Sequence, residues 1–334
     1  MIEVKNLVKK YGNHLAVDHM NFTIEEGHIY GFLGPNGAGK STTMNIMTGY
    51  LGATEGEVLI NGHDILKEPE EAKKQIGYLP ELPPLYMDMT VREYMEFAAE
   101  LKKIPKEKRA ESIEDVEKLV KIKDVEKRLI KNLSKGYRQR VGLAQAVLGF
   151  PEIIILDEPS VGLDPKQIIE IRELIRKLAK KHTVILSSHI LAEVREVCDY
   201  IMIISKGKLV ASDTPENLER NLGDSDLIEI ETKASPDEVR RILETVDGIR
   251  SISTKHLENG ITWAQIQEKK NTDVREKVFQ AFAQNHQPLL KLNPLQVSLE
   301  DVFMELTQSD RAAEEYAEKA KKKETEDMKD AGDL

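Results

Sequence analysis

A glycine-rich segment near the N-terminus has the residue types that bind phosphate groups. It follows the apolar run 29–33, precedes a helical pattern, fits G-x-x-x-x-G-K-[S/T], and reads Gly34-Pro35-Asn36-Gly37-Ala38-Gly39-Lys40-Ser41. Glycines let backbone N–H groups point toward a β-phosphate, and the dipole of the following helix favours negative charge there. We expect Lys40 to neutralise β- and γ-phosphate oxygens and the Ser41 hydroxyl to bind Mg²⁺. The order of strand, loop and helix argues against an ordinary glycine-rich turn.

Two adjacent carboxylates end a second apolar run. Residues 153–156 are Ile-Ile-Ile-Leu, and Asp157, Glu158 and Pro159 follow them. Ligands bind at the carboxyl ends of strands in open α/β sheets. We therefore expect Asp157 to hold Mg²⁺ through water and Glu158 to polarise the water that attacks the γ-phosphate. A cap of the next helix is the alternative, which the phosphate loop in the same chain disfavours.

A segment between these motifs resembles the signature of ABC ATPases, whose common form is Leu-Ser-Gly-Gly-Gln. It reads Leu133-Ser134-Lys135-Gly136-Tyr137. Taken alone, it is only a helix N-cap, so the assignment depends on its neighbours. The resemblance implies that residues 134–137 contact the ATP of a second copy, and that a homodimer sandwiches two ATP molecules head to tail. Lys135 and Tyr137 depart from the common form, and we expect Lys135 to add positive charge near the partner's phosphates.

Further positions between residues 11 and 189 fit the same family. Residues 160–164 resemble its D-loop, which ends at Asp164. His189 matches the switch histidine, and Tyr11 matches the aromatic residue that stacks on adenine. Glu81 stands where the family has a glutamine that contacts Mg²⁺ and the attacking water, although a plain surface carboxylate is the alternative.

The resemblance implies an ATP hydrolase with ATP and Mg²⁺ as cofactors. It assigns ATP binding to Tyr11, the phosphate loop and Thr42. The implied catalytic residues are Lys40, Glu81, Glu158 and His189. The implied ligands of Mg²⁺ are Ser41, Glu81 and Asp157.

The elements that must position these residues indicate an α/β fold. Short antiparallel strands are expected within residues 1–30, and a helical region interrupted at Pro105 within 90–130. Buried strands that alternate with helices indicate a mostly parallel sheet covered on both faces; the expected strands are 153–156, 183–187 and 201–204, and the expected helices 139–149, 165–180 and 190–197. The predicted fold is a P-loop NTPase of the ABC type, with an N-terminal antiparallel β subdomain and a helical subdomain.

The chain is expected to divide into three parts. A composition change near residues 221–224 places the nucleotide-binding domain at 1–222. Residues 223–308 read as strand, helix, two strands, helix, strand and helix, which suggests a small α+β accessory domain of the ferredoxin-like kind. Residues 309–334 are charged and nearly lack large apolar side chains, so we expect a frayed helix or disorder.

The composition restricts the cellular compartments and the binding partners that are expected for the protein. The net charge of −10 over 334 residues argues against a nucleic-acid partner. The lone Cys198 lies in an apolar run and is expected to be buried and inert. No run of about 18–20 apolar residues is present, and the N-terminus lacks a signal-peptide pattern. The expected location is therefore cytoplasmic, reaching a membrane only through a partner.

Two segments suggest what that partner is. Residues 82–90 place large apolar side chains on a proline-stiffened loop, where the family receives a helix of a membrane permease; internal packing is the alternative. Residues 297–307 resemble the C-terminal extension of bacterial ATPases that serve ABC-2-type exporters. The expectation is a bacterial export ATPase on the inner face of the cell membrane. The alternatives are a soluble ABC ATPase acting on ribosomes or DNA, and a regulatory clamp with little hydrolysis.

Overall fold

The computed structural model describes residues 1–222, 227–257, 260–269, 272–295 and 298–308. They divide into two compact units. Unit 1 contains Met1–Pro215 and the described residues 303–308, and unit 2 contains Glu216–Val302. The expected charged tail lies outside the described residues.

The division differs from the expected boundary at residue 222 in two ways. The chain leaves unit 1 at the start of α8 (Pro215–Leu222), and the second half of α11 (Leu299–Gln308) belongs to unit 1 rather than to the accessory domain. In unit 1, Leu306 is buried and the Ser205 hydroxyl donates a hydrogen bond to the carbonyl of Thr307 at 3.4 Å. The apolar face of a helix is visible in the sequence, but the surface that it packs on is not.

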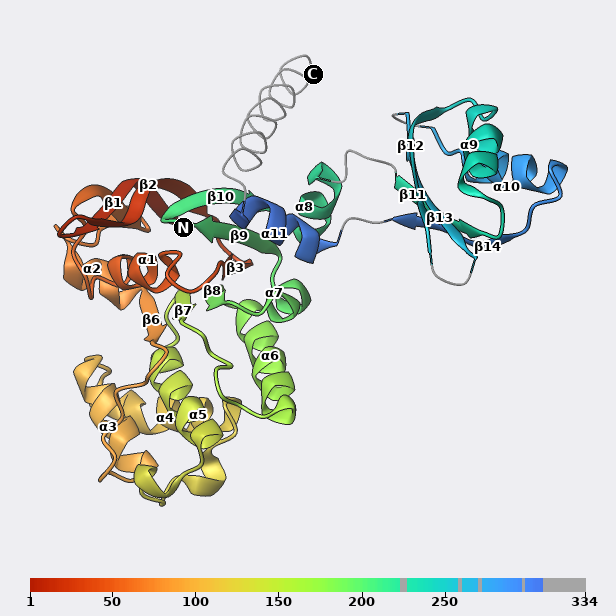
Figure 1. The fold of residues 1–334 in the computed structure, drawn as a ribbon. Helices are drawn as coiled ribbons and strands as arrows, with labels where there is room; N and C mark the ends of the chain where they lie inside the picture. The colour runs from red at the N-terminus through yellow and green to blue at the C-terminus, as the bar shows by residue number, and fades with distance from the viewer. Residues whose placement is uncertain (223–226, 258–259, 270–271, 296–297, 309–334) are drawn as a thin grey trace, which may run out of the picture. The chain divides into compact units, whose positions relative to one another are not determined.

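The N-terminal residues of unit 1 form an antiparallel sheet with the strand order β2-β1-β4-β5; Figure 1 labels β1 and β2 of this sheet. The strands are β1 (Ile2–Tyr11), β2 (His14–Ile24), β4 (Glu55–Ile60) and β5 (His63–Asp64). The expected antiparallel subdomain is confirmed. Because Tyr11 pairs with His14 at the tip of the first hairpin, the Tyr11 ring stands at an end of this sheet.

The second sheet of unit 1 has the order β10-β9-β3-β8-β7-β6. All its neighbours are parallel except β10 and β9. Its strands are β3 (Ile29–Leu33), β6 (Ile76–Leu79), β7 (Ile153–Leu156), β8 (Thr183–Ser188), β9 (Tyr200–Ser205) and β10 (Lys208–Asp213). Every residue of β3, β7 and β8 is buried, as expected for strands covered on both faces. Since these three are parallel neighbours, the loops that follow them meet at one edge.

Helices of unit 1 fall into two groups. Figure 1 shows α3, α4 and α5 together, at the opposite end of the unit from β1 and β2. These three are α3 (Val91–Leu101), α4 (Lys106–Leu119) and α5 (Lys135–Val147). The others are α1 (Lys40–Met47), α2 (Pro69–Lys74), α6 (Pro165–Ala179) and α7 (Leu191–Val197). Pro105 is the N-cap of α4, so the predicted interruption is confirmed. Helix α5 begins earlier than residue 139, because Ser134 caps it.

Unit 2 is a four-stranded antiparallel sheet with two helices on one face. Its elements are β11 (Leu227–Thr232), α9 (Pro236–Glu244), β12 (Ile249–His256), β13 (Thr262–Glu268), α10 (Arg275–Gln284) and β14 (Leu289–Leu295). The strand order is β12-β13-β11-β14, the arrangement of a ferredoxin-like β-α-β-β-α-β domain. Alternate residues of β11 and β13 are buried with apolar residues of α9 and α10 in one core. The small α+β domain of the predicted fold class is therefore present.

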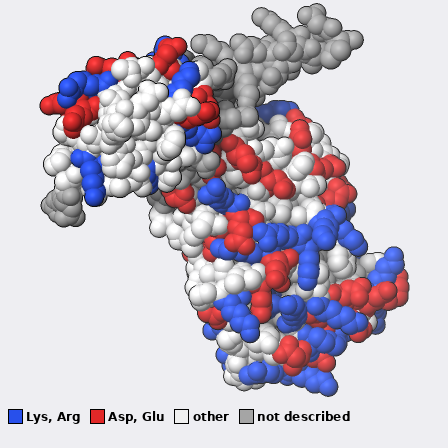
Figure 2. All heavy atoms as spheres, turned by 90° about the vertical axis from the view of Figure 1, so that its right-hand side faces the viewer, with Lys and Arg blue, Asp and Glu red and all other residues white. Residues whose placement is uncertain are grey.

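The described residues contain no helix long and apolar enough to cross a membrane. On the face drawn in Figure 2, Lys and Arg side chains are interspersed with Asp and Glu side chains. Cys198 is buried, and burial raises the pKa of its thiol, as expected for an inert cysteine.

Candidate functional site

The glycine-rich loop connects β3 to α1. A Cβ atom at Gly34 would lie 2.3 Å from the carbonyl oxygen of Ile204, so a side chain does not fit there. Gly39 has a φ of 106°, which residues with a side chain rarely adopt, and α1 begins at the next residue, Lys40. Glycine at these two positions therefore fixes the path of the loop against the sheet.

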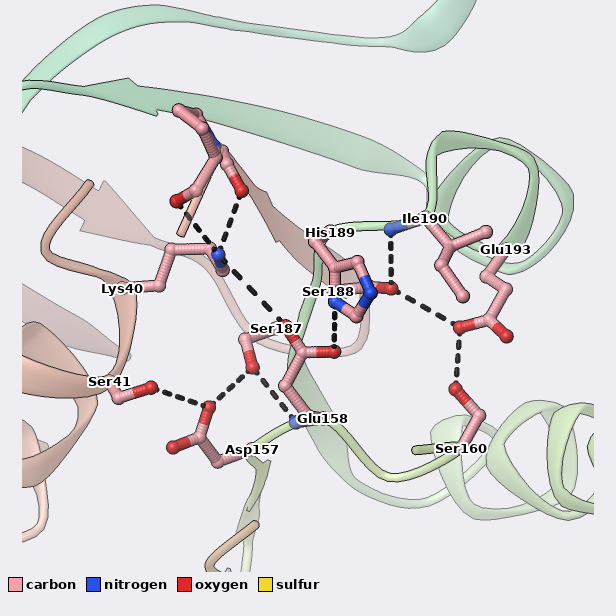
Figure 3. Close-up of polar contacts among 12 residues, drawn as sticks. Lys40, Ser41, Asp157, Glu158, Ser160, Ser187, Ser188, His189, Ile190 and Glu193 are labelled. Carbon is pink, nitrogen blue, oxygen red and sulfur yellow. Dashed lines mark hydrogen bonds and ion pairs between the residues drawn. The ribbon is translucent and has the colours of Figure 1, made fainter. Parts of the chain in front are cut away.

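The Lys40 ammonium group lies inside this loop. Lys40 is 6% exposed, and its Nζ donates hydrogen bonds to the carbonyls of Gly34 at 2.7 Å and Pro35 at 3.3 Å (Figure 3). Nζ also lies 3.9 Å from Glu158 Oε1. Burial lowers the pKa of Lys40, and nearby carboxylates, led by Glu158, oppose that shift. Anionic oxygens are favoured beside a cation that has lost most of its water.

Asp157 and Glu158 follow β7 and are held by Ser187 at the end of β8. The Ser187 hydroxyl donates to Asp157 Oδ1 at 2.5 Å and accepts from the Glu158 backbone N–H at 2.9 Å. The Ser41 hydroxyl donates to the same Asp157 oxygen at 3.2 Å. The distant segments that carry Ser41 and Asp157 are thus brought together, as the sequence predicts.

The paired hydroxyl and carboxylate of Ser41 and Asp157 fit a magnesium ion. Oxygen is the ligand atom that Mg²⁺ prefers, and Mg²⁺ in nucleotide sites commonly uses one or two carboxylates together with phosphate oxygens. No group of three His, Cys, Asp or Glu side chains in the described part of the chain is arranged to hold a metal ion. A magnesium ion here would therefore depend on oxygen atoms from a bound nucleotide.

Glu158 has an unusual backbone conformation and two polar neighbours. Its φ is 48°, in the left-handed region that costs a residue with a side chain about 1–3 kcal/mol. Glu158 Oε2 lies 2.9 Å from His189 Nδ1, while Oε1 faces Lys40 (Figure 3). Surrounding contacts must therefore hold this backbone in place, and they set the carboxylate between a cation and an imidazole ring.

These side chains border one open cavity of about 470 Å³. Its lining comprises Tyr11, His14, Ala16, Asn36, Gly37, Ala38, Gly39, Lys40, Ser41, Thr42, Glu81, Glu158, Val161 and His189. Tyr11 is 49% exposed, and Glu81 enters the lining from the loop after β6. The cavity therefore brings together the phosphate loop, Tyr11 and two of the three carboxylates that the sequence assigned to the site, those of Glu81 and Glu158. Asp157, the third, does not line the cavity but is hydrogen-bonded to Ser41, which does.

The signature residues do not line this cavity. Ser134 caps α5, and its hydroxyl accepts a hydrogen bond from the Tyr137 N–H at 3.4 Å. Gly136 and Tyr137 border a separate pocket of about 230 Å³. Within one chain, the predicted ATP-contacting residues thus fall into two places.

Both departures from the common signature contact their own chain. A Cβ atom at Gly162 would lie 1.9 Å from Lys135 Nζ, so the Lys135 ammonium packs on the D-loop. The Tyr137 hydroxyl donates to Asp124 Oδ2 at 2.8 Å. The D-loop residue Asp164 caps α6 through a hydrogen bond from the backbone N–H of Gln167 at 2.9 Å. Lys135 was expected to face a partner's phosphates, and in the single chain it lies against Gly162 instead.

Several residues of the site were not predicted from the sequence. Ser187 contacts both carboxylates, and His14, Ala16 and Val161 line the cavity. A signal for Ser187 was present, because a polar residue ends the apolar run that is predicted to be a neighbouring parallel strand. Val161 lies in the D-loop segment 160–164 that the sequence indicates, whereas His14 and Ala16 have no recognisable pattern.

Comparisons with known proteins agree with this geometry. The family model described as ABC transporter matches residues 17–161. The chain is 36% identical over 310 residues to the uncharacterized ABC transporter ATP-binding protein YhcH of Bacillus subtilis (strain 168), covering 92% of this chain and 96% of YhcH. It is 41% identical over 212 residues to the bacitracin transport ATP-binding protein BcrA of Bacillus licheniformis, covering 63% of this chain and 68% of BcrA.

Solved structures show the same relationship. The dimeric post-hydrolysis state of the ATP-binding cassette MJ0796, bound to ADP and Pi, matches with a TM-score of 0.59 and 28% identity over 64% of this chain and 98% of that chain. An ATP-binding subunit of an ABC transporter matches with a TM-score of 0.62 and 30% identity over 67% of this chain and 93% of that chain. The fold, the convergent motifs and these relatives together show that the chain belongs to the ABC transporter ATP-binding proteins and is an ATPase of that family.

Proposed function

We propose that the chain binds Mg-ATP in the 470 Å³ cavity, hydrolyses it in a head-to-tail homodimer, and powers export through a separate membrane permease. The observation that carries this proposal is the meeting of Lys40, Glu158 and His189 in one cavity, with Ser41 joined to Asp157 beside it. Phosphoryl transfer needs mainly positioning and charge stabilisation, and these side chains supply both.

The chain's own groups divide the work of hydrolysis. Lys40 stabilises the negative charge of the β- and γ-phosphates, since its ammonium is buried and directed into the loop. Glu158 accepts the proton of the attacking water, and His189, 2.9 Å from Glu158 Oε2, orients that carboxylate. Tyr11 stacks on the adenine ring.

Ser41 and Asp157 would hold a magnesium ion, and Glu81 would contribute a further carboxylate close to it. A bound Mg²⁺ would neutralise charge on the transferring phosphoryl group. Asp157 is fixed for this role by hydrogen bonds from two hydroxyls, those of Ser187 and Ser41. Glu81 lines the cavity and adds a carboxylate near the metal.

The separation of the signature residues from the cavity supports a dimer. Residues 134–137 form a helix start, which attracts anions, yet they border none of the cavity in their own chain. A second copy turned head to tail supplies its signature to the open side of the cavity. The relative MJ0796 has been solved as a dimer.

Two observations support a role in export: an exposed apolar surface and the transport named for one relative. Leu82, Tyr86 and Met87 are 81%, 54% and 37% exposed, and they follow the loop that carries Glu81. An apolar surface of this kind suits a helix of a permease. BcrA is named for bacitracin transport. We therefore place the chain on the inner face of a bacterial cell membrane, bound to its permease.

The dimer is tested with a Glu158→Gln variant, which keeps the shape of the site but lacks the base. With saturating ATP and Mg²⁺ it is expected to accumulate as a dimer on gel filtration, whereas Glu111→Gln, a change of an exposed residue in α4, remains monomeric. A Glu158→Gln chain that stays monomeric under these conditions counts against the sandwich.

The transport partner is tested by affinity purification from membranes. A polytopic membrane protein should be captured with the tagged chain, and Leu82→Glu with Tyr86→Glu should abolish that capture while leaving ATP binding intact. Capture of ribosomes instead would favour a soluble ABC ATPase. Little hydrolysis by the wild-type chain, with no further loss in Glu158→Gln, would favour the alternative of a regulatory clamp.

A further inference from the structure

A buried carboxylate, Glu193, joins two loops on either side of the active site. It lies in the first turn of α7 and is 6% exposed. Its Oε2 accepts hydrogen bonds from the Ser160 hydroxyl at 2.5 Å and from the Ser188 hydroxyl at 3.2 Å (Figure 3). Both serines are buried as well. One oxygen atom thus connects the start of the D-loop with the end of β8.

The two serines are neighbours of groups that face the cavity. Ser160 is the second residue after Glu158, and Ser188 directly precedes His189. Since His189 Nδ1 lies 2.9 Å from Glu158 Oε2, the contacts close a ring that passes through both loops and returns along the chain to Glu158. A shift of either loop must therefore be shared with the other or break a hydrogen bond.

Helix capping does not account for this carboxylate. An acidic residue in the first turn usually interacts with the unpaired N–H groups of its helix. Here the Ile190 N–H is bound by the Ser188 hydroxyl at 3.0 Å, and Glu193 is directed toward the two serines instead. Its other oxygen, Oε1, is buried and has no hydrogen-bond partner among the described residues. Because a buried, unsatisfied carboxylate oxygen costs folding free energy, packing alone would favour a neutral side chain.

We propose that Glu193 is a positioning residue that couples the D-loop, residues 160–164, to His189 and so aligns the Glu158 carboxylate for hydrolysis. The proposal rests on the proposed roles of Glu158 and His189. The left-handed backbone of Glu158 must be held from both sides. Ser187 holds its N–H, and the Ser160–Glu193 contact holds the turn that follows.

Steady-state ATP hydrolysis by the full-length Glu193→Gln chain tests this role. Glutamine keeps the shape but loses the charge that strengthens both hydrogen bonds. We expect kcat to fall about tenfold while KM for ATP changes less than about twofold. Glu196→Gln, which alters an exposed carboxylate on the same helix, should keep wild-type kcat. A merely structural role would lower the melting temperature and leave kcat of the folded chain unchanged, and that result overturns the proposal.

A double variant provides the second measurement. Ser160→Ala and Glu193→Gln break the same link, so the double variant should lose no more kcat than the larger single loss. If kcat of the double variant instead falls by the product of the two single losses, the two residues act independently, and that result overturns the coupling. If Glu193→Gln does not fold, Ser160→Ala decides alone: a loss of about tenfold in kcat at unchanged KM supports the link, and wild-type kcat contradicts it. Wild-type hydrolysis in Lys40→Ala would instead contradict the proposed function, so the two failures are distinguishable.

Discussion

The phosphate-loop half and the signature half of the proposed ATP site differ in how complete they are within one chain. On the phosphate-loop side, Ser41 and Asp157 come from distant segments and meet through hydrogen bonds that also include Ser187. On the signature side, Ser134 only caps its own helix, and Lys135 packs on its own D-loop. The first half is assembled at the cavity by folding, while the signature residues of the second border no part of that cavity in their own chain.

The two halves therefore differ in what fixes their geometry and in what strengthens their binding of ATP. The loop half is fixed by the burial of β3, β7 and β8, so its geometry is set by the fold of the chain. A helix start such as that of α5 attracts anions weakly by itself. In the proposed head-to-tail dimer, its contribution to ATP binding would come from association with a second chain, which would bring the two halves together.

The largest effect should follow from Lys40→Ala, which removes the buried cation of the complete half. Hydrolysis is expected to fall on the order of 10³-fold, because the γ-phosphate loses its main counter-charge. Steady-state phosphate release and fluorescent-nucleotide binding measure the loss. Lys177→Ala on the exposed side of α6 is the control and should behave like wild type. Equal turnover in both variants would mean that the loop does not bind the phosphates.

A smaller loss is expected from Ser134→Ala in the incomplete half. Hydrolysis should fall about 10²-fold, as when one transition-state donor is removed, while a single chain still binds ATP. Loss of the N-cap should also cost about 1 kcal/mol of stability. Ser235→Ala is the control, since Ser235 caps α9 in unit 2 and, like Ser134, accepts a hydrogen bond from the backbone N–H three residues further on. If both serine variants lose stability and neither loses hydrolysis, the signature serine is only a cap.

Tyr11→Ala should weaken ATP binding with little change in kcat. Stacking of a base on an aromatic ring is worth about 1–3 kcal/mol, and because the Tyr11 ring is half exposed we expect the low end, a rise of about fivefold in KM. Tyr11→Phe retains the ring and should keep the wild-type KM. If phenylalanine raises KM as much as alanine does, the hydroxyl rather than the stacked ring is the contact.

The sequence predicts the loop half well because its residues stand in two short motifs, each directly after an apolar run. Lys40, Asp157 and Glu158 stand beside apolar runs whose strand character follows from composition, so their meeting at one sheet edge follows from the topology of parallel strands. Ser187 and Glu193 belong to the same site only because β7 lies beside β8 and α7 follows it. For Ser187, the polar end of an apolar run is a local signal, whereas the contact of Glu193 with Ser160 is a property of packing that no local pattern encodes.

The same limit explains the departures in the other half and at the domain boundary. The charge of Lys135 is evident in the sequence, but its contact with Gly162 depends on how α5 lies against the D-loop. The return of residues 303–308 to unit 1 depends on an apolar face whose partner surface is set by the fold. Where the hydrophobic periodicity is strong, the sequence therefore predicts which segments are helices or strands. It does not predict which surfaces these elements pack against.

The smallest effect should come from Glu81→Gln, which replaces a departure in the complete half by the residue common in the family. Glu81 is exposed, so water and salt screen its charge and its interaction with a metal ion is worth less than about 1 kcal/mol. The Mg²⁺ concentration for half-maximal hydrolysis should rise about threefold, with kcat at saturating Mg²⁺ close to wild type. A magnesium titration of hydrolysis, with Glu111→Gln as control, measures the shift. If the Mg²⁺ requirement does not change, Glu81 is a surface carboxylate, and the metal depends on Ser41, Asp157 and the phosphates alone.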